Sequence, residues 1–421
     1  MSGVLSIAVY ALFIALILFG GKFAGRDGFF EEPFEKDALI PLRGVAAVGV
    51  IFHHISQEDA FEDLTRELWC FRKVGFLLVA VFMFSSGYGL IKSLKRKPGY
   101  MDTFAQRRFP EILVPFYMNV LIYGIIMPHY VGNYAPLQWV TNSLGLTMMN
   151  EYGWFTVAFF LLYVAFYFIF RKVKDIDKGI LYMLFVVLFM GVIFCVGGHF
   201  PWWTGEAGWW LESGAFSSAP WWKQIYVRWF GGEWWVNSVI GFVVGMVYGQ
   251  YDAEIINWFK KKYWVKLAGS VAFFAFTYWL FRVVDLNPGY WSEFKKPTPG
   301  IGDKFLCYFV QLFTTSSFVV MIATLLMKFK TSNLISRFFG KISFETFLMN
   351  YVVIYMFRFL TFKKVDGAWQ AVAYGPCNMN LILFTLGVFA VTTAFGFIVH
   401  YADQFLIKFF QKLSMKKKSA G

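Results

Sequence analysis

Apolar windows long enough to cross a bilayer recur along the whole chain. They lie near residues 4–20, 38–56, 74–91, 110–128, 154–170, 180–198, 235–250, 264–284, 305–327, 342–360 and 380–401. Because a helix needs roughly 17–25 residues to span the hydrocarbon core, each window predicts a transmembrane helix. The chain is 58% hydrophobic with a mean hydropathy of +0.53, which excludes an ordinary soluble domain. We therefore expect an all-α fold, a polytopic membrane helix bundle of about eleven transmembrane helices.

The connectors between these windows predict an orientation. Basic residues gather in alternate connectors and at the end of the chain: residues 92–108, 171–178, 260–262, 328–341 and 416–418. The connectors between them are acidic, aromatic or nearly free of cations. The positive-inside rule then places the N-terminus outside and the C-terminus in the cytoplasm. The net charge of +13 is thus explained by topology, and the expected partner is the lipid bilayer, with no nucleic acid.

The window at residues 38–56 contains ionisable side chains that are costly in a membrane. Arg43 and His54 are eleven positions apart, so a helix places them within roughly 20° of one face and about 16 Å apart along its axis. We expect them to face one cavity at two depths, Arg43 near the cytoplasmic leaflet and His54 further outward. Charged groups at such positions usually mark a functional site. His53 points about 100° away and is expected to have a packing role.

This pair suits acyl transfer from an anionic donor to an alcohol. A neutral imidazole can take a proton from a hydroxyl near neutral pH, and a guanidinium can bind a phosphate or a developing oxyanion. The structural alternative is an Arg43 side chain that extends to the membrane surface and a His54 ring held by a hydrogen bond. The cost of burying both groups favours the functional interpretation.

Several motifs in this chain resemble segments of the acyltransferase-3 family of integral membrane acyltransferases. They are Leu42-Arg43-Gly44-x-Ala46 with His54, Phe82-Met83-Phe84-Ser85-Ser86-Gly87-Tyr88, Arg107-Arg108-x-x-x-Ile112-x-x-Pro115, Trp154-Phe155 with Tyr163, and Gly340-Lys341-Ile342-Ser343-x-Glu345-x-Phe347-Leu348. Their order along the chain matches the family. The resemblance implies a transmembrane core at 38–401, preceded by an additional helix and cytoplasmic linker at 1–37 and followed by a basic cytoplasmic tail at 402–421.

The resemblance implies transfer of an acyl group, commonly acetyl, from cytoplasmic acyl-CoA to a hydroxyl of a cell-envelope glycan or lipid-linked sugar. It places the protein in a bacterial plasma membrane, with acetyl-CoA as the donor and no metal. Under this hypothesis His54 is the general base, and Arg43, Arg107 and Arg108 bind the donor. Further candidates for the cavity or the acceptor site are Ser86, Tyr88, Asn119, Glu151, Trp154, Ser343, Glu345 and Asn350.

Two positions depart from the family pattern. Glu111 stands where members often have arginine, which weakens the expected donor site beside Arg108. Asn350 stands where histidine often follows the late motif, and an amide can hydrogen-bond but cannot act as a second base. The departures keep a degenerate sensor or scaffold open as an alternative function.

A transporter or flippase for a glycan precursor is the main alternative. In that case Arg43 and His54 would bind substrate or protons. Many transporters have two halves of matching hydropathy with broken helices, and the glycine-rich spans here do not correspond in that way. Under the acyltransferase hypothesis, direct attack of the acceptor hydroxyl on the donor thioester and a transient acyl-His54 both remain open.

Two further features have alternative explanations. The connector 199–235 is rich in tryptophan, which suits an interfacial belt or a stacking platform for a glycan or lipid acceptor. The four cysteines (Cys70, Cys195, Cys307 and Cys377) lack metal-type spacing. All four are expected near the outer face, either as a disulfide or as unpaired packing residues.

Overall fold

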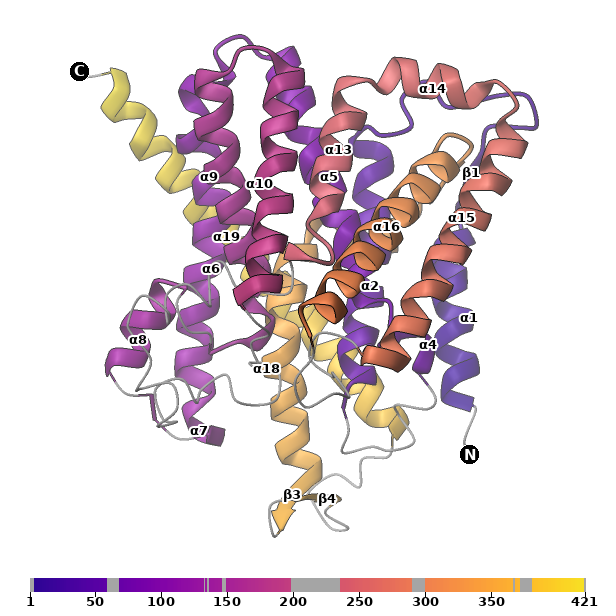
Figure 1. Ribbon diagram of the computed structural model, residues 1–421. Coiled ribbons are helices and arrows are strands. Elements are labelled where there is room, and N and C mark those ends of the chain that lie inside the picture. The colour runs from indigo at the N-terminus through magenta and orange to yellow at the C-terminus, as the bar shows by residue number, and fades with distance from the viewer. Residues whose placement is uncertain are drawn as a thin grey trace.

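The structure is a computed structural model that describes residues 4–58, 68–131, 133–134, 136–145, 149–197, 235–289, 300–365, 368–371 and 381–419. The chain is a helical bundle whose termini lie at opposite ends (Figure 1). Helix α14 (Asp252–Lys260) lies at the same end as the C-terminus, and α7 (Pro128–Val131), α8 (Pro136–Ser143) and the β3–β4 hairpin lie at the other. Opposite termini agree with the expected topology, while the orientation in the membrane stays a prediction.

Eight helical spans in the described part of the chain are long and apolar enough to cross a membrane. They correspond to α2 (Lys36–Ser56), α5 (Gly75–Arg96), α6 (Phe104–Ile126), α9 (Trp154–Lys172), α10 (Ile176–Gly197), α15 (Tyr263–Val284), α16 (Ile301–Leu326) and α19 (Leu381–Ser419). The other three expected windows form α1 (Val4–Leu18), α13 (Ile240–Gln250) and α18 (Ser343–Thr361). The polytopic helical fold is therefore confirmed, and the count of about eleven spans stays a prediction.

Short elements connect the long helices. They are α4 (Trp69–Arg72), α17 (Leu334–Lys341), the 3-10 turns η1 (Tyr100–Thr103) and η2 (Glu151–Gly153), the π-helical turn η6 (Asp285–Gly289), and the strands β1 (Lys22–Phe23), β2 (Phe329–Lys330), β3 (Phe362–Val365) and β4 (Ala368–Ala371). Strand β1 pairs antiparallel with β2, which joins the N-terminal linker to the segment after α16, and β3 pairs antiparallel with β4 as a hairpin. The two pairs form no larger sheet among the described residues.

Helix α2 lies in the centre of the bundle. Its apolar window is 78% buried inside the protein, whereas that of α15 is only 17% buried and therefore suits contact with lipid. Small residues explain the close packing of α2: a Cβ added at Gly44 would lie 1.8 Å from the Ser336 carbonyl oxygen of α17. The helix that contains Arg43 and His54 is thus held rigidly on several sides.

Helices α13 and α5 approach each other along a row of glycines. Cβ atoms added at Gly241, Gly245 and Gly249 would lie 2.9, 2.2 and 2.9 Å from backbone oxygens of Ala80, Phe84 and Tyr88. Both sets repeat every four residues, so one face of each helix meets the other with little side chain between them. This spacing is the small-xxx-small arrangement of membrane helix pairs.

Gly245→Ala should lower the thermal stability of the protein in detergent. The added methyl group overlaps the Phe84 backbone, and overpacking of this kind costs about 1–3 kcal/mol. Gly269→Ala on α15 is the matched control, because no atom lies within 4 Å of its added Cβ and alanine favours a helix by about 1 kcal/mol. Equal melting temperatures for the two variants would contradict the close packing of α13 on α5.

The segment before α2 is anchored by a buried lysine. Lys328 Nζ donates hydrogen bonds to the carbonyl oxygens of Gly25, Arg26 and Gly28 at 2.9, 2.7 and 2.6 Å. The ammonium also lies 4.0 Å from the centre of the Phe29 ring. Burial lowers the pKa of Lys328, and the three carbonyl oxygens satisfy its three N–H donors. The N-terminal linker is thereby fixed beside the end of α16.

Candidate active site

A cavity of about 740 Å³ lies between α2, α5, α6, α9, α18 and α19. Seven basic side chains line it: Lys36, Arg43, Lys92, Arg96, Lys97, Arg108 and Lys408, and Lys341 at the end of α17 adds an eighth. Polar side chains from the sequence-predicted set also line it, namely Ser86, Tyr88, Ser343 and Glu345. A strongly cationic cavity within a membrane bundle suits a polyanionic ligand.

Arg43 is the basic residue that α2 contributes to this cavity. Its Nε is buried and has no hydrogen-bond partner among the described residues. A buried donor of this kind is costly unless a ligand or water accepts from it. Arg43 therefore offers an unused, charged N–H group to an oxygen atom in the cavity.

The two arginines of the predicted donor motif have different surroundings. Arg108 lines the cavity, where its Nη1 pairs with Glu111 Oε2 at 2.7 Å and its Nε donates to the Tyr100 hydroxyl at 3.0 Å. Arg107 is exposed, does not line this cavity, and uses its carbonyl to accept from Gln411 Nε2 at 2.8 Å. The structure thus brings Arg43 and Arg108 together and leaves Arg107 outside. Glu111, the departure from the family pattern, holds Arg108 in position.

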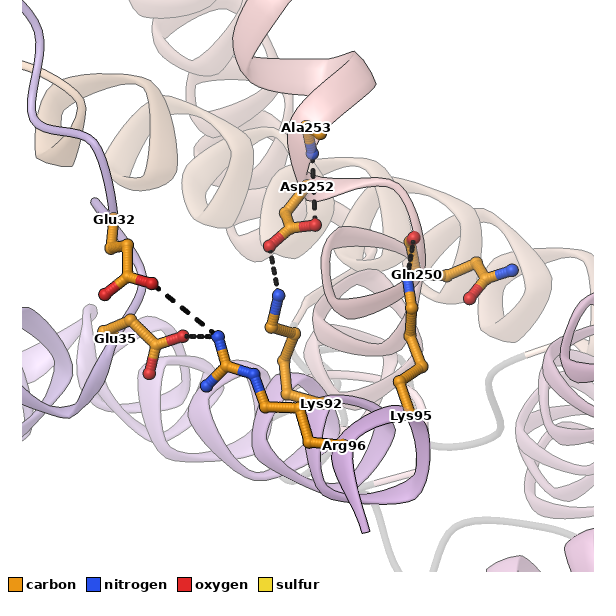
Figure 2. Close-up of polar contacts among 8 residues, drawn as sticks. All are labelled: Glu32, Glu35, Lys92, Lys95, Arg96, Gln250, Asp252 and Ala253. Atoms are coloured by element: carbon orange, nitrogen blue, oxygen red, sulfur yellow. Dashed lines mark hydrogen bonds and ion pairs between the residues drawn. The ribbon is translucent and has the colours of Figure 1, made fainter. Parts of the chain in front are cut away.

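Two basic side chains at the cavity mouth are already paired with carboxylates (Figure 2). Arg96 Nη2 lies 2.7 Å from Glu35 Oε1 and 3.8 Å from Glu32 Oε1, and Lys92 Nζ lies 2.5 Å from Asp252 Oδ2. Partly exposed ion pairs of this kind contribute at most about 1 kcal/mol, so a ligand with several phosphates can compete for them. Lys36, Lys97, Lys341 and Lys408 are exposed cations around the same mouth.

His54 is buried, with 5% of its surface exposed, and is oriented by two polar residues. Its Nδ1 lies 2.9 Å from Asn350 Oδ1, and Asn350 Nδ2 donates to Thr392 Oγ1 at 3.2 Å. Because the Asn350 amide nitrogen is directed to Thr392, its oxygen accepts from Nδ1–H. This network leaves Nε2 as the unprotonated nitrogen, which is the form a general base requires. Asn350 thus holds the tautomer of His54 and needs no titration.

Aromatic rings separate His54 from the cavity. Tyr152 stacks on the His54 ring with centroids 3.7 Å apart and planes at 3°, and Phe347 contacts the same ring edge-to-face at 5.6 Å. The ring centroid of Phe347 in turn lies 4.7 Å from that of Phe155, and Phe155 lines the cavity together with Phe344. The structure differs here from the single shared cavity expected for Arg43 and His54. Both residues lie on α2, but bulky rings from α9 and α18 fill the space between their levels.

The remaining predicted residues divide between the cavity and the His54 level. Ser86 Oγ lies 2.9 Å from the Tyr163 hydroxyl, and both side chains line the cavity. Tyr88 also lines it and packs edge-to-face on Phe34 at 5.8 Å. Trp154 begins α9, and its ring lies 6.4 Å from Phe347 near His54.

Four other predicted features have outcomes in the structure. Glu151 begins η2, and its side chain lies outside the described part of the chain. Asn119 is buried and accepts from Asn150 Nδ2 at 2.9 Å, away from the cavity lining. His53 Nδ1 bonds the Phe71 carbonyl oxygen at 2.9 Å and its ring packs on Gly75, which agrees with the predicted packing role. Cys70, Cys195 and Cys307 are free, whereas Cys377 and almost all of the tryptophan-rich connector (198–234) lie outside the described residues.

Three residues near the site were missed in the sequence. Tyr152 is identified only by its stacking on His54. His400 lines the cavity and pairs through Nδ1 with Glu345 Oε1 at 3.0 Å, and Asp403 is fully buried one turn further along α19. A histidine and an aspartate three positions apart at the end of an apolar window were a visible signal, because ionisable residues there are costly. No cluster of three metal-ligating side chains was found in the described residues.

Comparison with known proteins identifies the family. A family model described as an acyltransferase domain, that of acyltransferase family 3, matches residues 37–401. No curated protein and no solved structure matches the chain. The matched range includes the segments that contain Arg43, His54 and Asn350 and most of the residues that line the cavity, whereas Lys36 and Lys408 of the lining lie outside it. The chain is therefore a membrane acyltransferase-type protein that belongs to the acyltransferase-3 family.

Proposed function

We propose that this protein transfers an acyl group, most simply acetyl, from cytoplasmic acyl-CoA to a hydroxyl of a cell-envelope glycan or lipid-linked sugar. The observation that carries the proposal is the cationic cavity lined by Arg43, whose buried Nε lacks a partner in the described structure. The expected setting is a bacterial plasma membrane with the cavity mouth toward the cytoplasm.

The cavity matches an acyl-CoA donor in charge and polarity. The phosphates of CoA lie at one end of an elongated molecule and would meet the lysine and arginine side chains at the mouth. The thioester lies at the other end and would reach Arg43, where a guanidinium N–H can bind the carbonyl oxygen as it becomes negative. Arg43 would thus act on the reacting carbonyl, and the exposed cations would act on the phosphates.

The acceptor hydroxyl would approach His54 from the outer end of the bundle. His54 Nε2 would take the hydroxyl proton while the oxygen forms a C–O bond to the acyl carbon and the C–S bond breaks. Tyr152 and Trp154 offer flat aromatic surfaces beside His54 on which a sugar ring could pack. Direct attack and a transient acyl-His54 are both compatible with this arrangement.

The aromatic rings between the two levels support a short acyl group. Phe155 and Phe347 are 2% and 3% exposed and leave little space beyond the cavity. An acetyl group needs only a small rearrangement of these rings to reach the His54 level, whereas a long chain would displace several of them. This packing is the reason for preferring acetyl-CoA among acyl donors.

Purified protein in vesicles should release free CoA from acetyl-CoA when an envelope glycan extract is present. The labelled acetyl group should appear on the glycan, and added CoA should compete for the donor site. Because exposed cations at the mouth bind the phosphates, donor affinity should fall as the salt concentration rises. Glycan transport without acylation would support a transporter instead, and absence of both activities would contradict the proposal.

A further inference from the structure

A second histidine, His400 of α19, lines the cavity in addition to the residues of α2. His400 of α19 and Glu345 of α18 both line the cavity, and His400 Nδ1 lies 3.0 Å from Glu345 Oε1. Glu345 is 4% exposed, and its other oxygen, Oε2, has no partner among the described residues. The proposed reaction as described above uses neither side chain.

Helices α18 and α19 hold the two histidines at different levels of the bundle. At one level Asn350 joins His54 to Thr392, and at the other Glu345 binds His400. Close contact at Gly396, where an added Cβ would lie 2.4 Å from Thr346 Cγ2, locks the helices between these levels. Thr392 and His400 are eight residues apart, which corresponds to about 12 Å along α19. Helices α18 and α19 therefore fix the imidazole of His54 at one level of the bundle and the imidazole of His400 at the other.

The charges around His400 favour its protonated form. Glu345 accepts from Nδ1, and Asp403 is fully buried with both carboxyl oxygens unpartnered among the described residues. Lys341 and Arg43 are the basic groups nearby, and Arg43 interacts electrostatically with Glu345. The Glu345 carboxylate against the ring stabilises the imidazolium, and since Nδ1–H is held by Glu345, Nε2–H is the proton left for a ligand.

We propose that His400 is the proton donor to the departing CoA thiolate, with Glu345 holding the proton on its ring. The proposal rests on the proposed acyltransferase function. A thiolate formed inside a membrane-embedded cavity is poorly solvated, which raises the affinity of its sulfur for a proton. His54 serves the acceptor side of the acyl carbon, where it takes the proton of the attacking hydroxyl, so the sulfur needs a proton donor of its own on the cavity side.

The complete step balances with two histidines. The acceptor oxygen forms a bond to the acyl carbon and its proton passes to His54, while the C–S bond breaks and sulfur takes the Nε2 proton of His400. CoA leaves as the neutral thiol. His400 regains a proton from water at the open cavity mouth, and His54 releases its proton on the acceptor side. No oxidant, reductant or metal is required.

The test replaces the leaving group while keeping the rest of the donor. The selenium analogue of acetyl-CoA has the same shape, but its selenolate is stable without a proton at neutral pH. His400→Gln should slow acetyl transfer from the thioester by about 100-fold, in the range typical of a lost general acid. With the selenoester, the same variant should come within about tenfold of the wild-type rate. Donor binding, measured as competition by CoA, should stay unchanged.

Glu345→Gln and His129→Gln complete the experiment. Glu345→Gln should slow acetyl transfer from the thioester less than His400→Gln does, and its rate with the selenoester should likewise come close to the wild-type rate. This variant replaces His400→Gln if that variant does not fold. His129 is an exposed histidine on α7, and its substitution should leave both rates unchanged. Equal losses with both donors, or a wild-type rate for His400→Gln on the thioester, would overturn the proton-donor role. A wild-type protein inactive on both donors would instead overturn the proposed function.

Discussion

His54→Ala should reduce acyl transfer to the acceptor by between about 10²-fold and 10⁴-fold. The substitution removes the imidazole that the structure holds in one tautomer through Asn350 and Thr392, and with it the expected base for the acceptor hydroxyl. CoA should still bind with wild-type affinity, because His54 does not line the cationic cavity. The measurements are labelled acetyl transfer and competition binding on the same preparation.

His53→Ala is the matched control for this prediction. His53 is adjacent in sequence and bonds only the Phe71 carbonyl oxygen through Nδ1 in the described structure, so its loss should affect stability more than the rate. The His54 role would be contradicted by a His54→Ala protein that folds, binds CoA and transfers acetyl at the wild-type rate. A labelled acyl group recovered on His54 after rapid quenching would distinguish the relay from direct attack.

The sequence was sufficient to predict the properties that depend on one helix at a time. Apolar windows predicted the long helices, and the helical repeat predicted that Arg43 and His54 lie near one face of α2. The same argument predicted that His53 points about 100° away in a packing role, and in the structure its Nδ1 bonds the Phe71 carbonyl oxygen. Such predictions succeed because helix phase and bilayer thickness are local constraints that each window must satisfy alone.

The contacts that define the site are not local. Asn350 binds His54 across 296 residues of sequence, and Glu345 meets His400 across 55. The expected shared cavity was wrong in its extent because phenylalanines of α9 and α18, which the sequence shows only as apolar residues, fill the space between the two levels. The outward position of Arg107 likewise depends on the packing of α6 against α19. No periodicity within a single helix could reveal these contacts.

Asn350 illustrates how a departure from a family pattern can keep a function. As an amide it cannot titrate, and the sequence therefore placed its role in doubt. The structure shows that its oxygen faces His54 Nδ1 while its nitrogen is directed to Thr392. An amide fixed in this way always accepts from Nδ1–H, so it keeps Nε2 of His54 unprotonated. A titrating residue would do the same only in one of its protonation states. Glu111 is similar, because it positions Arg108 at the cavity wall.

Arg43→Ala is expected to lower the turnover number by about 10²- to 10³-fold with little change in donor affinity. Arg43 lines the cavity with a buried Nε that has no partner among the described residues, whereas the phosphates of the donor are expected at the exposed cations of the mouth. The methyl group cannot stabilise the oxyanion that forms on the thioester carbonyl. Turnover number and KM for acetyl-CoA, measured separately, test this division.

Arg43→Lys and Lys97→Ala complete the comparison. A lysine keeps the positive charge but lacks the planar fork of N–H donors. The turnover number of Arg43→Lys should therefore stay close to that of Arg43→Ala if Arg43 binds the carbonyl. Recovery by lysine would instead mean that Arg43 is a phosphate clamp, for which a point charge is sufficient. Lys97, an exposed cation at the mouth, should show the opposite pattern, since its loss removes only ground-state binding and raises KM. The mouth would then recognise the donor, and Arg43 would act on the bond that breaks.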